Sequence, residues 1–333
     1  MVGGPGTNVG VLVTGTSHTV TGIPAGPHTW TVATSYDPGG IRTTADRWSR
    51  ATATVVNHSG RYRILMTGFR VQRPTFDDRV NGNGDEVYAS ASVTTIDRRT
   101  DAVLQARALI RSGTYGDISR DAQRVRAGSF SASGGLWTGD AVPAGTDPRT
   151  TSAAPSAARF PLALWEGTLR DGIDAVVINP VLWEEDGQIE YYNEWADANS
   201  STRRQAQRAA AQNAAIRDRA ARGDAQPFRG MLVFICSSAS DLIPDCKPGN
   251  DRPIGINRET CVGDTFVSNL LAWCDVTVVV TREAIENALS GPAIGGAAPG
   301  VIAVPLVEPG GVDLVKGGLD GHYEMYLRLE RVP

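Results

Sequence analysis

Apolar and polar side chains alternate in the first part of this chain, and a period of two is typical of strands that bury one face. Before residue 57 the alternation comes in three short bursts, at residues 9–13, 29–33 and 51–56, separated by Gly/Pro turns. Longer segments with strand signals follow, at residues 61–72, 86–97, 162–166, 174–184, 230–236, 274–280, 301–307 and 323–332. The pattern therefore predicts a mainly β protein built from antiparallel strands.

One long segment does not follow this period. Residues 201–222 are rich in Ala, Arg and Gln, with Ser200 or Ser201 as a possible N-cap and Gly223 as a stop signal. We expect this helix to pack on a sheet as an insertion, with a partner-binding helix as the alternative. A shorter helix is predicted at residues 282–289 after Thr281. Residues 140–158, rich in Pro, Thr, Ser and Ala, are expected to form an exposed connection.

The chain of 333 residues is long enough for a small domain and a large one. We expect a small partial sheet over residues 1–57. The second domain, residues 60–333, is predicted to be a large antiparallel β-sandwich with a helical insertion at about 200–223.

Composition narrows the classes of function. The formal net charge is −4, so nothing in the composition favours binding to nucleic acid. No stretch reaches the roughly 20 apolar residues of a transmembrane helix, so no transmembrane segment is expected. The N-terminus lacks the features of a signal peptide, so we expect that any export signal was removed or belonged to a longer parent chain.

The four cysteines cluster at Cys236, Cys246, Cys261 and Cys274, without the spacing of a zinc or redox motif. Disulfides are favoured, with Cys246 joined to Cys261 and Cys236 joined to Cys274. Four unpaired buried thiols are the alternative. Two disulfides would indicate an oxidising compartment, which favours a secreted or cell-surface protein.

An acidic, glycine-containing loop at residues 75–86 lies between two predicted strands. It offers oxygen ligands of the kind that Ca²⁺ prefers, and its glycines allow the backbone to turn tightly. The candidate ligands are Asp77, Asp78, Asn81, Asn83, Asp85 and Glu86. The spacing does not match an EF-hand, because Glu86 stands where that loop has glycine. A solvated hairpin turn is the alternative to a metal site.

Catalytic motifs are sparse. No histidine lies near a nucleophile motif such as Gly-x-Ser-x-Gly, and no Gly-rich loop joins a strand to a helix. Paired carboxylates remain as a possible basis for a carbohydrate-active hydrolase, because several acidic residues lie close to Trp165 and Trp183. These acidic residues are Glu166, Glu184, Glu185 and Asp186.

Two resemblances follow from these motifs. Residues 20–40, with the sequence VTGIPAGPHTWTVATSYDPGG, resemble the second half of a fibronectin type III domain, and the likeness extends over about residues 9–56. Only the last strands of such a domain are present. The resemblance therefore implies a fragment of a larger multidomain surface protein.

The acidic loop between two strands resembles a C2-like calcium-binding sandwich over roughly residues 60–187. This resemblance implies a second acidic loop at the same edge, supplied either by Asp97 and Asp101 or by Glu185 and Asp186.

The sequence as a whole favours a secreted or cell-surface binding or adhesion module, stabilised by Ca²⁺, whose ligand would be a carbohydrate or a protein. The alternatives are an extracellular carbohydrate-active hydrolase and a structural spacer of a larger surface protein.

Overall fold

The computed structural model describes residues 2–4, 7–11, 26–33, 48–55, 59–75, 84–116, 134–185, 187–200, 215–233, 251–254, 273–293, 295–307 and 321–333. The chain divides into two compact units. The first comprises Met1–Ser59 together with Arg170–Ile173, and the second comprises Gly60–Leu169 together with Asp174–Pro333.

The first unit contains a four-stranded antiparallel sheet with the strand order β2-β1-β3-β4. Its strands are β1 (Val2–Gly4), β2 (Thr7–Val11), β3 (Gly26–Ala33) and β4 (Trp48–Val55). The three bursts of alternation correspond to β2, β3 and β4. The sequence did not predict β1, because three residues that include two glycines carry no alternation.

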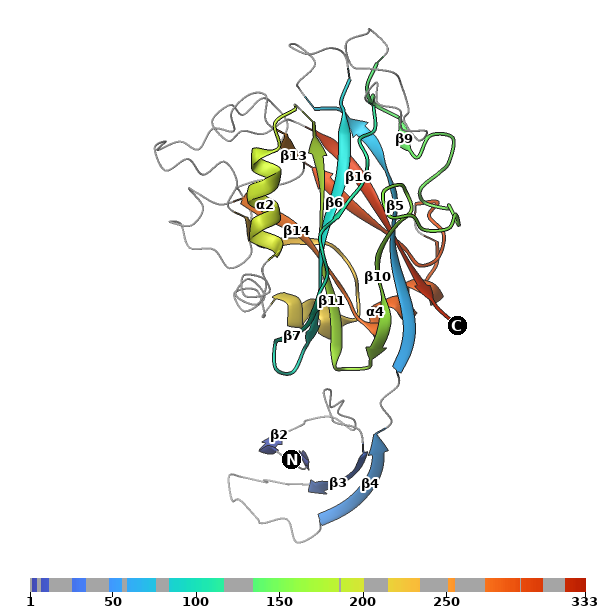
Figure 1. Cartoon of the computed structure of the whole chain (residues 1–333). Coiled ribbons are helices and arrows are strands. Elements are labelled where there is room, and N and C mark those ends of the chain that lie inside the picture. The colour runs from blue at the N-terminus through green and yellow to red at the C-terminus, as the bar shows by residue number, and fades with distance from the viewer. Residues whose placement is uncertain are drawn as a thin grey trace, which may run out of the picture. The chain divides into compact units, whose positions relative to one another are not determined.

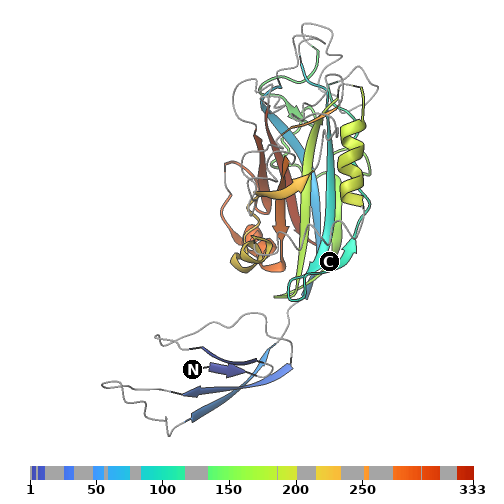
Figure 2. The same cartoon turned by 90° about the vertical axis from the view of Figure 1, so that its left-hand side faces the viewer.

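The second unit is an antiparallel β-sandwich (Figures 1 and 2). The first sheet has the order β10-β5-β16-β15, and β9 pairs with β5. Its strands are β5 (Ser59–Arg73), β9 (Ala141–Val142), β10 (Leu162–Arg170), β15 (Val301–Val307) and β16 (His322–Arg331). The mainly β fold expected from the alternation is confirmed.

The second sheet has the order β12-β14-β11-β6-β7, with β13 beside β11 and β8 beside β6. Its strands are β6 (Val87–Asp97), β7 (Ala102–Ala106), β8 (Ile110–Arg111), β11 (Asp174–Glu184), β12 (Phe228–Val233), β13 (Arg252–Ile254) and β14 (Trp273–Val280). The long strands match the predicted segments. The short strands β7, β8, β9 and β13 were not predicted.

The inner faces of the two sheets form the main core. Ile64 and Met66 of β5 belong to the same buried cluster as Ala89 of β6 and Ile178 of β11. A β-bulge at Gly68 then changes which residues of β5 point inward. Gly68 has φ 144°, and a Cβ atom there would lie 1.9 Å from the carbonyl oxygen of Val142. Glycine is therefore required at this position.

Helices cover the outer face of the second sheet. Helix α2 (Glu190–Ser200) packs Trp195 against Trp183, and a second helix, residues 215–222, packs near Val177. Because both of their faces are covered, β6 and β11 are buried at every residue. This burial explains why β11 consists almost entirely of apolar residues.

The helical insertion is present but differs in its bounds from the predicted helix. The structure has α2 before residue 201, and residues 201–214 lie outside the described part of the chain. The predicted stop is confirmed, since Gly223 follows residues 215–222 with φ 60°. Helix α4 (Arg282–Ser290) is also confirmed, and the Thr281 side chain accepts a hydrogen bond from the backbone N–H of Ala284.

Residues 140–158, expected to be an exposed connection, partly pack against the outer face of the first sheet. The hydroxyl of Thr67 donates to the carbonyl oxygen of Pro148 at 2.7 Å. Arg328 donates to the carbonyl oxygen of Thr151. Pro148 is buried, whereas residues 152–158 are exposed as predicted.

The sandwich has two distinct ends. Antiparallel pairing places Glu184 beside Val87 at one end and Asp174 beside Asp97 at the other. We call these the loop end and the turn end. His322 pairs with Arg73 at the loop end, and Arg331 pairs with Tyr62 at the turn end.

The described residues next to several long segments lie at the loop end, which is at the top in Figure 1. These segments are 76–83, 117–133 and 308–320, flanked by Thr75 and Gly84, by Gly116 and Gly134, and by Val307 and Gly321 respectively. The β6–β7 connection at the turn end is only residues 98–101.

Candidate functional site at the loop end

A buried carboxylate closes the base of the acidic loop. Asp85 is 2% exposed, and its Oδ2 atom accepts hydrogen bonds from the backbone N–H of Thr75 at 2.7 Å and from the hydroxyl of Tyr323. Its Oδ1 atom accepts from the Thr75 hydroxyl at 2.9 Å. We call Thr75, Asp85 and Tyr323 the Asp85 group. It joins both ends of the loop to β16.

The Asp85 group also determines the state of its tyrosine. Burial, followed by the negative charge of Asp85, raises the pKa of Tyr323 well above its ordinary value. The phenol therefore stays protonated and donates to Asp85. The hydrogen bonds from Thr75 and Tyr323 thus satisfy the buried oxygens of the Asp85 carboxyl group.

The second acidic loop lies directly beside the first. The backbone N–H of Glu185 donates to the carbonyl oxygen of Glu86 at 2.7 Å. Glu184, 2% exposed, lies 3.9 Å from the guanidinium of Arg252 in β13. Of the two loops that the C2-like resemblance implied, the one at residues 184–187 is therefore at the same end as Asp85.

A further segment meets the sandwich at this end. The hydroxyl of Tyr88 donates to Oδ2 of Asp251 at 2.8 Å, and the backbone N–H of Gly187 donates to Oδ1 at 3.2 Å. Asp251 is fully buried and immediately precedes β13. The middle of the cysteine-containing segment is thus fixed beside the second acidic loop.

An aromatic cluster on the second sheet and α2 lies next to these loops and supports them. Tyr88 and Trp183 stack with their ring centroids 6.3 Å apart, and Trp195 of α2 packs edge-on against Trp183. The guanidinium of Arg111 lies 3.8 Å from the centre of the Tyr88 ring and 4.6 Å from that of Tyr192. The loop end therefore rests on a rigid, well-packed base.

Most of the predicted calcium ligands lie outside the described residues: Asp77, Asp78, Asn81, Asn83 and Asp186. In the sequence they lie between Thr75 and Gly84 and between Glu185 and Gly187, and these four described residues are at the loop end. Within the described ranges, no group of three His, Cys, Asp or Glu side chains is arranged to hold a metal ion.

The candidate ligands that the structure describes are not equally suited to bind a metal ion. Three protein donors already occupy the carboxylate of Asp85, so this residue fits an anchor of the loop better than a direct ligand. Glu86 is half-buried, and its backbone carbonyl oxygen accepts the Glu185 N–H.

Asp97 does not belong to this site. It ends β6, whereas Asp85 precedes it, and twelve strand residues span roughly 35–40 Å. Ligands of one Ca²⁺ lie within about 5 Å of each other. The expectation that Asp97 or Asp101 completes the loop-end site is therefore corrected by the length of the strand.

At the turn end, Asp97 has a structural role instead. It accepts hydrogen bonds from the backbone N–H of Arg99 at 2.8 Å and from its guanidinium at 2.7 Å. These bonds lower the pKa of Asp97 to about 2. Asp101 forms an ion pair with Arg217. Both carboxylates hold the β6–β7 turn in place.

The carboxylates suggested for a hydrolase do not gather in one cleft. Glu166 of β10 is exposed and paired with Arg61 at 3.0 Å, on the first sheet, whereas Glu184 ends β11 on the second. Trp165 is buried and donates to Thr95 at 3.1 Å. Trp183 is fully buried and donates to Ser90. Neither indole offers an open surface on which a sugar could stack.

The cysteine pairings stay a prediction. Cys236, Cys246 and Cys261 lie outside the described residues, and Cys274 lies in β14 opposite Leu232 of β12. The two strands that flank the cysteine segment are thus paired neighbours, as the expected Cys236–Cys274 bridge requires.

Sequence reasoning missed the residues that hold the loop end together: Tyr88, Asp251 and Tyr323. A tyrosine in the expected inward phase of β16 indicates burial, and a buried hydroxyl needs a partner. That signal predicts a polar partner for Tyr323 but does not identify Asp85. No pattern in the sequence pairs Tyr88 with Asp251.

Comparison with known proteins gives no relative: no family model, no curated protein and no solved structure matches this chain. Among the described helices, none has the length and apolar character needed to cross a membrane. The function is therefore argued from the site alone.

Proposed function

We propose that this protein is a binding module of a secreted or cell-surface protein, with its ligand-contacting face at the loop end and with Ca²⁺ ordering that face. The observation that supports the proposal is the hydrogen bond from the backbone N–H of Glu185 to the carbonyl oxygen of Glu86, which joins one described residue of each acidic loop. Loops placed together on a rigid sheet are a common basis for recognition, because they vary while the scaffold stays constant.

The arrangement of charge supports a cation at this end. Glu86, Glu184 and Glu185 are close in space, and residues 77, 78 and 186 add three further aspartates to the two loops. Arg252 lies 3.9 Å from Glu184. The oxygen-bearing side chains of the two loops are of the kind that Ca²⁺ prefers, with Asp77, Asp78, Asn81, Asn83, Glu86 and Asp186 as the proposed ligands.

A thermal-unfolding titration tests the proposal. Ca²⁺ bound only by the folded protein stabilises it by about 2.7 kcal/mol at 100 times the dissociation constant, and a chelator should reverse the shift. The double variant Asp77→Asn/Asp78→Asn should lose the Ca²⁺ response. Asp218→Asn, which removes an exposed carboxylate on the helix at 215–222, should keep it.

The outcomes separate the proposal from its alternatives. If Ca²⁺ and chelator leave the melting temperature of the wild-type protein unchanged, Ca²⁺ does not order the loop end, and a structural spacer becomes the better account. If the double variant responds like the wild-type protein, the ion binds elsewhere.

A further inference from the structure

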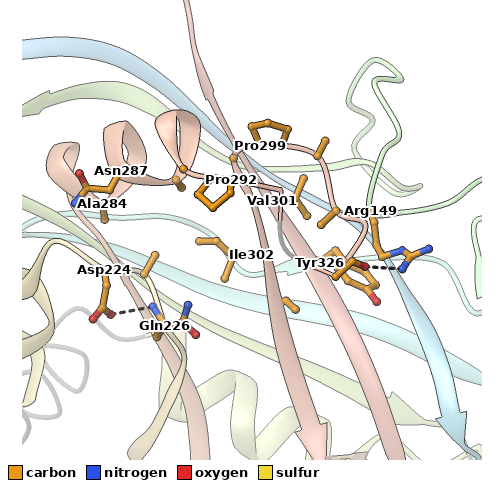
Figure 3. Close-up of a pocket in the computed structure, with 18 of the residues that line it drawn as sticks. Arg149, Asp224, Gln226, Ala284, Asn287, Pro292, Pro299, Val301, Ile302 and Tyr326 are labelled. Carbon is orange, nitrogen blue, oxygen red and sulfur yellow. Dashed lines mark hydrogen bonds between the residues drawn. The ribbon is translucent and has the colours of Figure 1, made fainter.

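A hollow of about 470 Å³ lies beside α4, and the residues that line it do not include Thr75, Asp85 or Tyr323 (Figure 3). It is formed by α4, residues 222–226, the loop at 291–300 and the first residues of β15, and Arg149 and Tyr326 line one side of it. Its volume lies within the usual range for small-molecule sites, about 300–1,000 Å³.

Small apolar side chains line the inner part of the hollow. Ala225, Ala284, Ala297 and Ile302 are each less than 9% exposed, and Pro292 projects nearby in Figure 3. Protein interiors are normally close-packed. Here the side chains around the hollow are small and leave it unfilled, so its apolar wall is available to a ligand. The apolar CH groups of a ligand could pack there.

The charged groups around the hollow are already paired within the protein. Arg149 donates to both oxygens of Asp147 and to the carbonyl oxygen of Gly295 at 2.9 Å. Asp224 lies 3.7 Å from the guanidinium of Arg219. Glu324 accepts the hydroxyl of Tyr326. A charged ligand would therefore have to displace an existing partner.

Two neutral side-chain amides, Asn287 of α4 and Gln226 of the segment before β12, also line the hollow. Asn287 donates from Nδ2 to the carbonyl oxygen of Gly223 at 2.8 Å, which leaves its side-chain oxygen outside that bond. The side-chain amide of Gln226 makes no hydrogen bond to another described residue. Side-chain amides both donate and accept, which suits hydroxyl groups that also do both.

We propose that this hollow binds a neutral sugar, through the side-chain amides of Gln226 and Asn287 and the apolar surface around Ile302. An uncharged ring with hydroxyl groups on its edge and CH groups on its face matches this combination of surfaces. The proposal does not depend on the loop end or on Ca²⁺.

Saturation-transfer NMR and calorimetry with the full chain, in the presence of a chelator, test the proposal. The probes are glucose, galactose and N-acetylglucosamine at up to about 10 mM, which detects a dissociation constant near 1 mM. Glucuronate and glucosamine serve as charged counterparts. We expect at least one neutral sugar to bind, and its charged counterparts to bind at least about tenfold more weakly.

Two variants locate the site. Ala288→Phe places a ring in the hollow and should abolish binding, whereas Ala163→Phe, on exposed surface of β10, should not. Gln226 lies outside any helix or strand. The variant Gln226→Ala should weaken sugar binding about threefold to tenfold, which is the effect of one lost hydrogen bond. The proposal is overturned if no neutral sugar binds, if charged sugars bind equally well, or if binding survives both Ala288→Phe and Gln226→Ala.

Discussion

The two ends of the sandwich are held together by different means. At the turn end the carboxylate of Asp97 bonds to Arg99, two residues away, and Asp101 of the same turn pairs with the more distant Arg217. At the loop end Asp85 bonds to Tyr323, 238 positions away, and Tyr88 bonds to Asp251, 163 positions away. Local bonds close a short turn, whereas long-range buried bonds position the residues that flank long loops.

The difference also lies in the partners of the carboxylates. Glu286 and Asp97 at the turn end are paired with arginines, and these ion pairs lower the pKa of each carboxyl to about 2. Asp85 at the loop end accepts hydrogen bonds from hydroxyl and backbone donors, and the backbone N–H of Glu185 donates to the carbonyl oxygen of Glu86.

The largest expected effect is at the loop end. Asp85→Ala removes the acceptor of three hydrogen bonds and leaves the N–H of Thr75 and the hydroxyl of Tyr323 buried without a partner. We expect the free energy of unfolding to fall by about 3 kcal/mol or more, measured by urea denaturation.

The matched control is Asp101→Asn at the turn end, where asparagine tolerates the positive φ of 59°. It should cost less than about 0.5 kcal/mol, because the ion pair with Arg217 is largely exposed. If Asp85→Ala and Asp101→Asn lowered the free energy of unfolding equally, the two ends would not differ in how strongly their carboxylates stabilise the fold.

Acid should lower the free energy of unfolding by a smaller amount, through the protonation of Asp97 at the turn end. The folded-state pKa of Asp97 is about 2, below its ordinary value of 3.8, so its contribution to stability is present above pH 4 and is lost as the pH falls toward 2. We expect a contribution of about 1–2 kcal/mol.

Urea denaturation at a series of pH values between 6 and 2.5 measures this contribution in the wild-type protein and in Asp97→Asn. Other carboxylates titrate in both proteins, so the difference between the two curves isolates Asp97. Parallel curves would contradict the proposed role of the Asp97–Arg99 pair.

The sequence predicted the sandwich well where long runs of β-branched and other apolar residues occur. The expected strands at residues 174–184 and 301–307 agree with the bounds of β11 and β15. It missed β13, since three residues carry no period, and it missed α2, although Tyr191 and Trp195 have the i, i+4 spacing of one helix face. Short strands and aromatic-rich helices are specified by packing rather than by pattern.

For the candidate site, the sequence indicated the acidic composition but not which loops meet. Asp97 could have been excluded from the sequence, because the strand that separates it from Asp85 is too long. The nearness of Glu185 to Glu86 could not be predicted, because it depends on the register between β6 and β11.

Amide hydrogen exchange measured by mass spectrometry, with and without Ca²⁺, tests the central claim most directly. If the loop end is the calcium-ordered binding face, Ca²⁺ should slow exchange in peptides that cover residues 76–86 and 184–188. Exchange in peptides covering 96–101 and 282–290 at the turn end should stay unchanged. Unchanged exchange in both acidic loops, or equal slowing at the two ends, would contradict the account.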